Sequence, residues 1–362
     1  SYLPPLMVYL AAGISGFTGI IESFFVKEQL GLSAAFLAGL AFWAGLPWAL
    51  KMPLGHMVDL FWRRKAAFVY LGATLMALSL LIMVGLTGHA QWMASFLPVD
   101  IWYIISVLLS PVGFVLQDVV ADAMTVEAVP AVDEAGSPIA DAKLQRMHVT
   151  MQTLGRMAII GGSALVAGLG GWLASILSYE IMYKWSLVIP LISVLGVTLG
   201  SWTTRRRHHQ LRHEGFSAEK IDKMLRTHDA RTAPNWYILG GSGIFVIMTL
   251  LLGLSDLQLK KEIIFAGSLG IIGYLIHQLV RDMDPIKRRE IIGIAVIIFV
   301  FRAIPSFGPG ALWWQIDVLG FNEAFLGTLR QIASLLAIAG MVALRSWMGR
   351  HPVPYLVVFL SV

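Results

Sequence analysis

The sequence of 362 residues contains no cysteine and little charge: 14% of its residues are Asp, Glu, Lys or Arg, against about 25% in soluble globular chains. Without cysteine, thiol catalysis, disulfide bonds and cysteine-ligated metal sites are excluded. The shortage of charge argues against a soluble enzyme, a nucleic-acid binder and a disordered protein. The sequence also lacks a phosphate-binding loop and an HExxH zinc motif, so we expect no enzyme, no bound cofactor and no metal.

Hydrophobic residues make up 57% of the chain and form long continuous runs. Because about 20 apolar residues in a helix cross the hydrocarbon core of a bilayer, these runs predict an all-α polytopic membrane protein. We expect ten full spans and the start of an eleventh, at residues 6–26, 34–54, 66–87, 101–124, 148–176, 182–203, 235–254, 263–281, 291–318, 323–345 and 353 onward.

The 27 Lys and Arg residues are distributed unevenly over the two sides of the predicted membrane. Nineteen fall in loops on one side, four on the opposite side and four within spans. By the positive-inside rule, the richer side and the N-terminus are cytoplasmic, which predicts a multi-pass protein of the inner (plasma) membrane. The run Arg205–Arg207 is then an orientation signal, and we expect no nucleic-acid partner.

An internal repeat relates residues 30–40 to residues 319–329, with six of the eleven positions identical. Chance similarity between two Leu-rich segments is the alternative, but both segments lie between a first and a second span on the same predicted side. Duplication is a frequent feature of transporters. It predicts four parts and a C-terminal half that lacks about four helices in this sequence. These parts are an N-terminal six-helix half (1–203), a cytoplasmic linker (204–234), an inserted two-helix hairpin (235–289) and the start of a C-terminal half (290–362).

The loop after the second span runs from Gly55 to Lys65 and carries Asp59, Arg63 and Arg64. An acidic residue at a helix end and a basic cluster opposite it can latch two halves of a transporter together, and a positive-inside anchor is the simpler interpretation. The pattern G-x-x-x-D followed by R-R-K resembles the signature of the major facilitator superfamily.

Four further segments resemble the folate–biopterin transporter branch of that superfamily. Residues 46–55 are similar to its P-W-x-x-K-P-x-x-G pattern and residues 117–127 to its D-x-x-x-D-A-x-x-x-E run. Residues 25–33 and 304–327 complete the set. The muropeptide permease branch shares P-x-x-x-K and Q-D-x-x-x-D-A and is the second choice.

The resemblance implies a major facilitator fold that works by alternating access. It further implies proton-coupled symport of a small organic anion, similar to a folate or a pterin, by a monomer in the lipid bilayer. A permease for cell-wall fragments is one alternative. A pigment-handling or assembly factor that transports nothing is another, because it would share the same fold.

Charged side chains within spans need a partner or a wet cavity, since each costs about 2.5–3.5 kcal/mol at a helix centre. Asp118 and Asp122 are four residues apart and share a helix face, and we expect Arg156 in the next span to be their counter-ion. The functional interpretation is a switch in which a protonated carboxylate releases the cation. The alternative is a static ion pair, which we prefer for Asp122.

Three more charged residues and one proline complete the candidates. Arg302 lies deep in the ninth predicted span, where an anionic substrate would need a cation; an interhelical pair with Glu22 or Asp118 is the alternative. Lys51 is a candidate substrate contact or a side chain that reaches the interface, and Glu22 is a candidate proton site or an interfacial group. Pro305 opens a Pro- and Gly-rich break that predicts a gating hinge or a packing kink.

Overall fold

The computed structural model describes residues 2–130, 139–217, 221, 233–281, 283–304, 307–348, 355 and 359. All regular elements within these ranges are helical, as the sequence predicts. Nine helical segments of the described residues are long and apolar enough to cross a membrane. They are Leu3–Gln29, Ala34–Leu60, Lys65–Gly88, Val99–Ala128, Lys143–Ala174, Tyr179–His213, Trp236–Gly253, Lys260–Val280 and Glu323–Leu344.

The chain divides into two compact units. The first comprises Ser1–Arg231 and Gly308–Leu344, and the second comprises Thr232–Phe307 and Arg345–Val362. In the second unit, α12 (Trp236–Gly253) packs against α13 (Lys260–Val280), which is followed by α14 (Pro285–Arg302).

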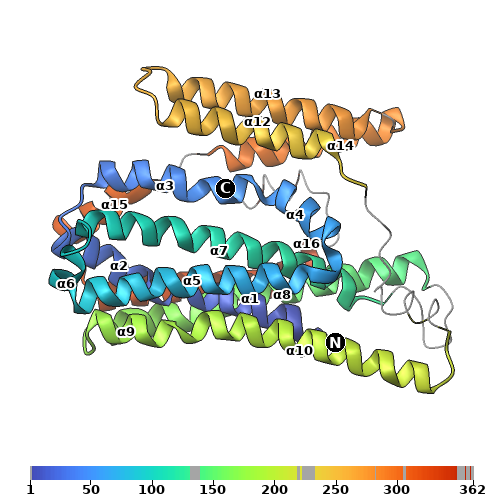
Figure 1. Cartoon of the computed structure of the whole chain (residues 1–362), viewed down its shortest axis with the longest axis horizontal. Coiled ribbons are helices and arrows are strands. Elements are labelled where there is room, and N and C mark those ends of the chain that lie inside the picture. Colours follow the sequence, from blue (N-terminus) through green and yellow to red (C-terminus); the bar gives the residue numbers. More distant parts are fainter. Residues whose placement is uncertain are drawn as a thin grey trace. The chain divides into compact units, whose positions relative to one another are not determined.

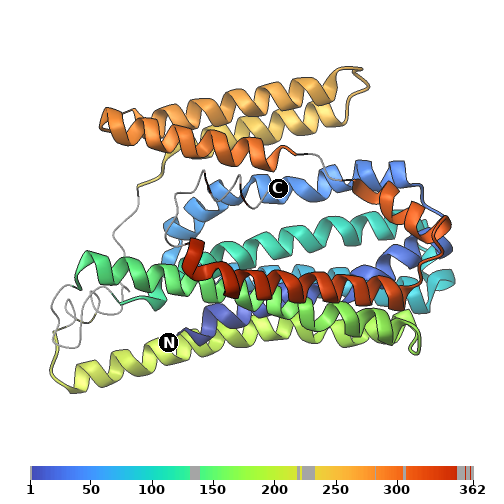
Figure 2. The ribbon, with the colours of Figure 1, turned by 180° about the vertical axis from the view of Figure 1, so that it is seen from behind.

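The first unit is a bundle of helices that run back and forth along one direction (Figures 1 and 2). Its elements are α1 (Leu3–Ile14), η1 (Ser15–Thr18), α2 (Gly19–Phe24), η2 (Phe25–Gln29), α3 (Ala34–Ala49), α4 (Lys51–Leu60), η3 (Trp62–Arg64), α5 (Lys65–Gly88), α6 (Ala90–Ala94), α7 (Val99–Ala128), α8 (Asp141–Ala174), α9 (Tyr179–Ser186), α10 (Val188–His213), α15 (Gly308–Asp317) and α16 (Glu323–Met348).

Glycines let the helices of this bundle approach closely. A Cβ added at Gly72 on α5 would lie 2.5 Å from the carbonyl oxygen of Gly113 on α7. A Cβ at Gly162 on α8 would lie 3.0 Å from the carbonyl oxygen of Leu10 on α1. Small residues at such crossings are how helices associate tightly in lipid, where the hydrophobic effect gives little attraction between them.

The two largest apolar cores of the bundle lie one toward each end of the first span. The core near the start of α1 contains Val8, Val69 and Val120, among others. The core near the end of α2 contains Ile21, Phe25 and the buried tyrosines of α7 and α9. The polar groups described below lie beside these two cores.

A break divides the second span into α3 and α4. Pro53 has no N–H to donate to the carbonyl of Ala49, so regular helix bonding fails there. Leu50 adopts φ −88° and ψ 8° at the break. Lys51 is therefore the first residue of a new helix, directly after the bend.

The ninth predicted span is not one helix. Residues 291–318 were expected to cross the membrane without interruption, whereas α14 ends at Arg302 and α15 begins at Gly308. Gly308 has φ 63°, outside the right-handed helical region, and Pro309 supplies no N–H, so the two helices stay separate. Pro305 itself, and nearly all of the eleventh span from 353 onward, lie outside the described residues.

The two repeat segments fold alike, although they are 289 positions apart. Gly31 and Gly320 both adopt the left-handed conformation, with φ 61° and φ 67°. Two residues later, Ser33 Oγ accepts the N–H of Phe36 at 3.1 Å, as Asn322 Oδ1 accepts that of Phe325 at 2.9 Å. Each helix therefore starts with the same side-chain cap after the same glycine turn.

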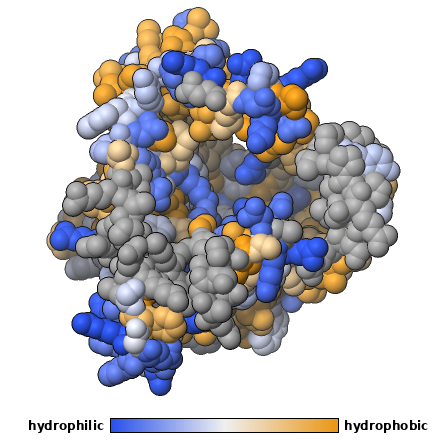
Figure 3. All heavy atoms as spheres, turned by 90° about the vertical axis from the view of Figure 1, so that its right-hand side faces the viewer, coloured by the Kyte–Doolittle hydropathy of each residue, from blue (hydrophilic) through white to orange (hydrophobic). Residues whose placement is uncertain are grey.

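The last helix of the N-terminal region continues beyond its predicted span. The apolar pattern ends near residue 203, but α10 runs to His213 and carries exposed Arg205, Arg206 and Arg207. Figure 3 faces the end of the molecule where α10 ends and shows hydrophilic side chains gathered there.

Candidate functional site

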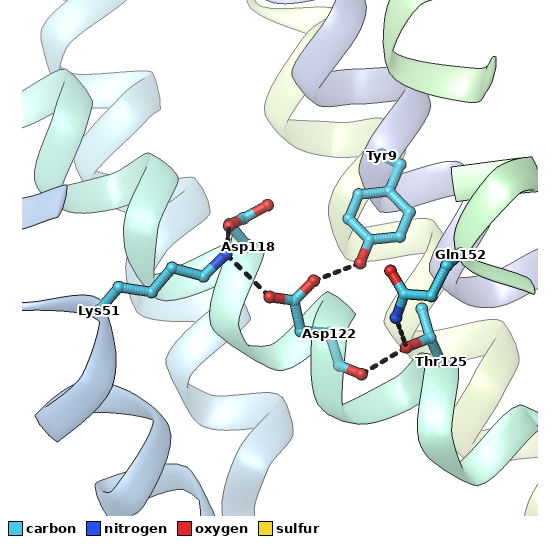
Figure 4. A network of polar contacts seen from close by, with 6 residues as sticks. All are labelled: Tyr9, Lys51, Asp118, Asp122, Thr125 and Gln152. Atoms are coloured by element: carbon cyan, nitrogen blue, oxygen red, sulfur yellow. Dashed lines mark hydrogen bonds and ion pairs between the residues drawn. The ribbon is translucent and has the colours of Figure 1, made fainter. Parts of the chain in front are cut away.

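One lysine holds two carboxylates together inside the bundle. Lys51 Nζ on α4 lies 2.5 Å from Asp118 Oδ2 and 2.8 Å from Asp122 Oδ2, both on α7 (Figure 4). The exposed fractions of the three side chains are 39%, 14% and 43%. With all three groups ionised, the cluster carries one net negative charge, so it can accept a proton or give up its lysine to another anion.

A tyrosine and two further polar side chains extend this cluster to the neighbouring helices. The Tyr9 hydroxyl on α1 donates to Asp122 Oδ1 at 2.5 Å. Thr125 Oγ1 donates to the carbonyl oxygen of Asp122 at 2.6 Å and accepts from Gln152 Nε2 of α8 at 3.2 Å. The network joins α1, α4, α7 and α8 (Figure 4), so a charge change at Asp122 reaches four helices.

The packing around the network explains why Tyr9 reaches Asp122. A Cβ at Gly155 on α8 would lie 2.7 Å from Tyr9 Cε2, so only glycine leaves room for the ring. Asp118 and Tyr9 also line a small, mainly apolar cavity with Met76, Gln117 and other residues of α1, α5, α7 and α10.

The counter-ion of the two aspartates is therefore Lys51, not the expected Arg156. Arg156 is exposed on α8 and has no carboxylate within ion-pair distance among the described residues. Position within a hydrophobic run gives the depth of a residue but not the direction in which it faces. The bend at Leu50 also brings Lys51 toward α7 rather than leaving it to reach for the interface.

The loop after the second span makes a different contact from the one expected. Lys65 pairs with Glu127 at the end of α7, and Lys65 Nζ lies 3.8 Å from the centre of the Trp62 ring. Asp59 and Arg64 are exposed, and the side chain of Arg63 lies outside the described residues. A latch made by Asp59, Arg63 and Arg64 stays a prediction.

At the opposite end of the bundle, several contacts tie α15 and α16 to the N-terminal helices, and three of them define what we call the α15/α16 seam. Lys27 on η2 pairs with Asp317 at the end of α15. The Tyr179 hydroxyl on α9 donates to Glu323 Oε1 at the start of α16 at 2.8 Å. Gly171 on α8 meets α16, and a Cβ added there would lie 2.7 Å from the Cα of Gly327. α16 accordingly lies along α8 (Figure 2).

Glu22 lies near the seam, on α2. The Tyr103 hydroxyl donates to Glu22 Oε1 at 3.0 Å. The described residues place no cation within ion-pair distance of this carboxyl group. Its hydrogen bond runs into the bundle, to a tyrosine that is 4% exposed.

Arg302 is the last residue of α14, in the second unit, and is exposed. The two carboxylates considered as its interhelical partners lie in the first unit, where Glu22 is bonded to Tyr103 and Asp118 to Lys51. Its role as a cation for an anionic substrate stays a prediction. Among the described residues, no cluster of three or more His, Asp or Glu side chains forms a metal site.

Sequence reasoning missed the hydroxyl and amide partners of these carboxylates, namely Tyr9, Tyr103, Tyr179, Thr125 and Gln152. A tyrosine carries no charge and lowers the mean hydropathy of an apolar run only slightly. Its hydroxyl is therefore easy to overlook in such a run. The available signal was that Tyr9 and Tyr103 are phenols inside otherwise apolar spans, where a hydroxyl usually has a partner.

Comparison with known proteins gives two matches. The sequence model of the BT1 family matches residues 12–362. A curated folate-biopterin transporter from Synechocystis sp. is 23% identical over 343 residues, which cover 93% of this chain and 52% of that protein. The chain thus spans about half the length of the curated relative that it matches.

Proposed function

The chain belongs to the BT1 family, a branch of the major facilitator superfamily, and on that premise we propose that it is a secondary active transporter. BT1 proteins are multi-pass membrane transporters and not enzymes. The proposed cargo is a small organic anion of the folate or pterin class, and the proposed mechanism is proton-coupled alternating access. The name of the Synechocystis relative supports the substrate class.

The observation that carries the proposal is the cluster of Lys51, Asp118 and Asp122. An anionic substrate that approaches Lys51 competes with the two carboxylates for the ammonium group. A proton taken up by Asp118 or Asp122 removes one competitor and releases Lys51 to the substrate. The switch proposed from the sequence is retained, with Lys51 in place of Arg156 as the cation.

Charge balance explains why proton and substrate would move together. The cluster has one net negative charge when Lys51, Asp118 and Asp122 are all ionised. A substrate carboxylate alone would raise this to two, in a region where uncompensated charge costs several kcal/mol. One proton bound with each added negative charge keeps the total unchanged. Coupling then follows from electrostatics, without a separate device.

Alternating access also needs two halves that rock about the site. We propose that residues 1–203 form the N-terminal six-helix half and that the C-terminal half begins at residue 290, after the linker 204–234 and the hairpin 235–289. The shared turn at Gly31 and Gly320 supports duplication. The Lys and Arg distribution supports a cytoplasmic N-terminus in the inner (plasma) membrane, and we propose a monomer.

The test is uptake of labelled folate by vesicles that carry the native full-length protein, with and without an imposed proton gradient. Gradient-driven accumulation would support both the substrate class and the coupling. If the folded protein takes up no folate, labelled muropeptide is the next substrate. Failure with both anions would contradict transport and favour a pigment-handling or assembly role.

A further inference from the structure

Glu22 differs from two other half-buried carboxylates of the first unit in the group that is bonded to it. Asp118 has Lys51 and Glu127 has Lys65, whereas Glu22 has a tyrosine hydroxyl. Around it lie Ile21, Phe25 and other apolar residues of the second core. An ionised carboxylate is poorly solvated in such surroundings, and a carboxylic acid is accommodated well.

A second tyrosine beside Glu22 has an unused hydroxyl. Tyr183 on α9 is 2% exposed, and its hydroxyl has no hydrogen-bond partner among the described residues. It lies close enough to Glu22 and Tyr103 to interact with them electrostatically. Buried hydroxyls usually have a hydrogen-bond partner, so this group is a donor that a change in charge at Glu22 can use. The second oxygen of an ionised Glu22 is the acceptor that the surroundings offer.

The charged and titratable groups near Glu22 lie on α7, α9, η2 and α16, and α8 also packs on α2. Tyr103 comes from α7, Tyr179 and Tyr183 from α9, and Lys27 from η2. Arg330 on α16 is near: its Nη1 would lie 3.8 Å from a Cβ at Gly19, one turn before Glu22. Arg330 makes no ion pair with Glu22, and Lys27 is held by Asp317.

Glu22 is also connected to the α15/α16 seam through two short paths. Along its own segment, the π-helical turn η2 leads to Lys27, which pairs with Asp317. Through Tyr183, one turn of α9 leads to Tyr179, which pairs with Glu323. Ile20 and Phe24, on either side of Glu22, pack in a core with Leu326 of α16. Water that reached Glu22 would thus disturb the groups that hold the seam closed.

We propose that Glu22 is a proton-binding site and that its proton keeps the α15/α16 seam closed. This inference deepens the proposed function by naming the residue through which a proton controls one gate. The bound proton makes the carboxyl group neutral, and a neutral group is stable among the apolar residues around Glu22. Loss of the proton creates a charge that needs water, and water enters when α15 and α16 separate from α2 and α9. The seam therefore opens as the pH rises.

The absence of cysteine from this sequence makes the test direct. Spin labels on Gln29→Cys and Val318→Cys, two exposed positions next to Lys27 and Asp317, report the width of the seam in lipid vesicles. We expect the distance between the labels to lengthen as the pH is raised. In Glu22→Gln, whose amide cannot ionise, the distance stays short at every pH, and proton-driven accumulation of folate is lost.

Two further variants keep the test decisive. Glu28→Gln removes an exposed carboxylate from the same segment and keeps the pH response. Tyr103→Phe leaves Glu22 in place but removes its donor, which disfavours the ionised form and moves the midpoint of the response to higher pH. A response that survives in Glu22→Gln, or is absent from the parent protein, overturns the proposal, as does an unmoved midpoint in Tyr103→Phe.

The distance measurement needs no transported substrate, so the two proposals can fail separately. If the width of the seam depends on pH in a protein that takes up neither folate nor muropeptide, the proposed role of Glu22 stands and the proposed transport function is contradicted. If proton-driven uptake is equal in the parent protein and in Glu22→Gln, the proposed transport function stands and the proposed role of Glu22 is overturned.

Discussion

Lys51 Nζ and Asp118 Oδ2 are 2.5 Å apart, and this contact joins the bend of the second span to the middle of α7. The same ammonium group is 2.8 Å from Asp122. One cation therefore separates two carboxylates that would otherwise face each other across a single helical turn. The stability of the bundle and the affinity for an anion should depend on the same side chain.

Lys51→Met should destabilise the protein and abolish uptake. The substitution leaves two neighbouring carboxylates without a cation. Breaking a fully buried pair costs roughly 3–5 kcal/mol, and the partial exposure of Lys51 reduces this to about 1–3 kcal/mol. Thermal unfolding in detergent measures the loss. Lys261→Met, at an exposed position of α13, is the matched control and should unfold like the parent protein.

A double variant separates charge from packing. Asp118→Asn added to Lys51→Met removes one of the two facing carboxylates and should return part of the lost stability, but not the uptake. If the double variant is no more stable than Lys51→Met alone, repulsion between the aspartates is not the cause.

Asp118→Asn alone should make substrate binding independent of pH. In the proposed switch, a proton on the carboxylate frees Lys51 for the anion, and the amide mimics the protonated form permanently. We expect KM for folate to stay low as the pH rises, where the parent protein loses affinity. Asp141→Asn, exposed at the start of α8, should keep the parent profile. An unchanged pH profile in Asp118→Asn would make Asp118 a structural partner only.

Much of the architecture could be predicted because it depends on local composition. Long apolar runs located the spans, and four short patterns identified the folate–biopterin transporter resemblance, which the BT1 match over residues 12–362 confirms. The glycine turn and its Ser or Asn cap in both repeat segments also follow from local sequence. The exception was the span at 291–318, where composition is apolar but Gly308 and Pro309 prevent a continuous helix.

The partners within the site could be predicted less well because they depend on helix rotation. Asp118 and Asp122 were placed together correctly by their spacing of one turn. Arg156 was assigned as their cation from its depth alone, and among the described residues it forms an ion pair with neither aspartate. Lys51 reaches them because Pro53 breaks the second span. The depth of a residue in its span follows from hydropathy. The direction of its side chain follows from packing between glycines and aromatic rings that are far apart in the sequence.

Gly171→Ala should weaken the α15/α16 seam. The added methyl group would meet the backbone of Gly327, and forcing such contacts apart costs about 1–3 kcal/mol. We expect the labels at Gln29→Cys and Val318→Cys to move apart already at low pH, where Glu22 is protonated. Gly161→Ala on the same helix is the control, since a Cβ there meets nothing within 4 Å. Equal distances in the two variants would show that the glycine contact does not hold the seam.

Arg302→Ala should abolish uptake of anionic substrates without preventing membrane insertion. Lys51 already has two carboxylates, whereas Arg302 is exposed at the end of α14, and we propose that its guanidinium binds the added anion. Arg289→Ala, exposed on the same helix, removes the same charge near the start of α14 and should leave uptake unchanged. Uptake of labelled folate by vesicles with equal amounts of inserted protein measures the difference. Normal uptake by Arg302→Ala would assign anion binding to Lys51 alone and leave Arg302 as a positive group at the end of its helix.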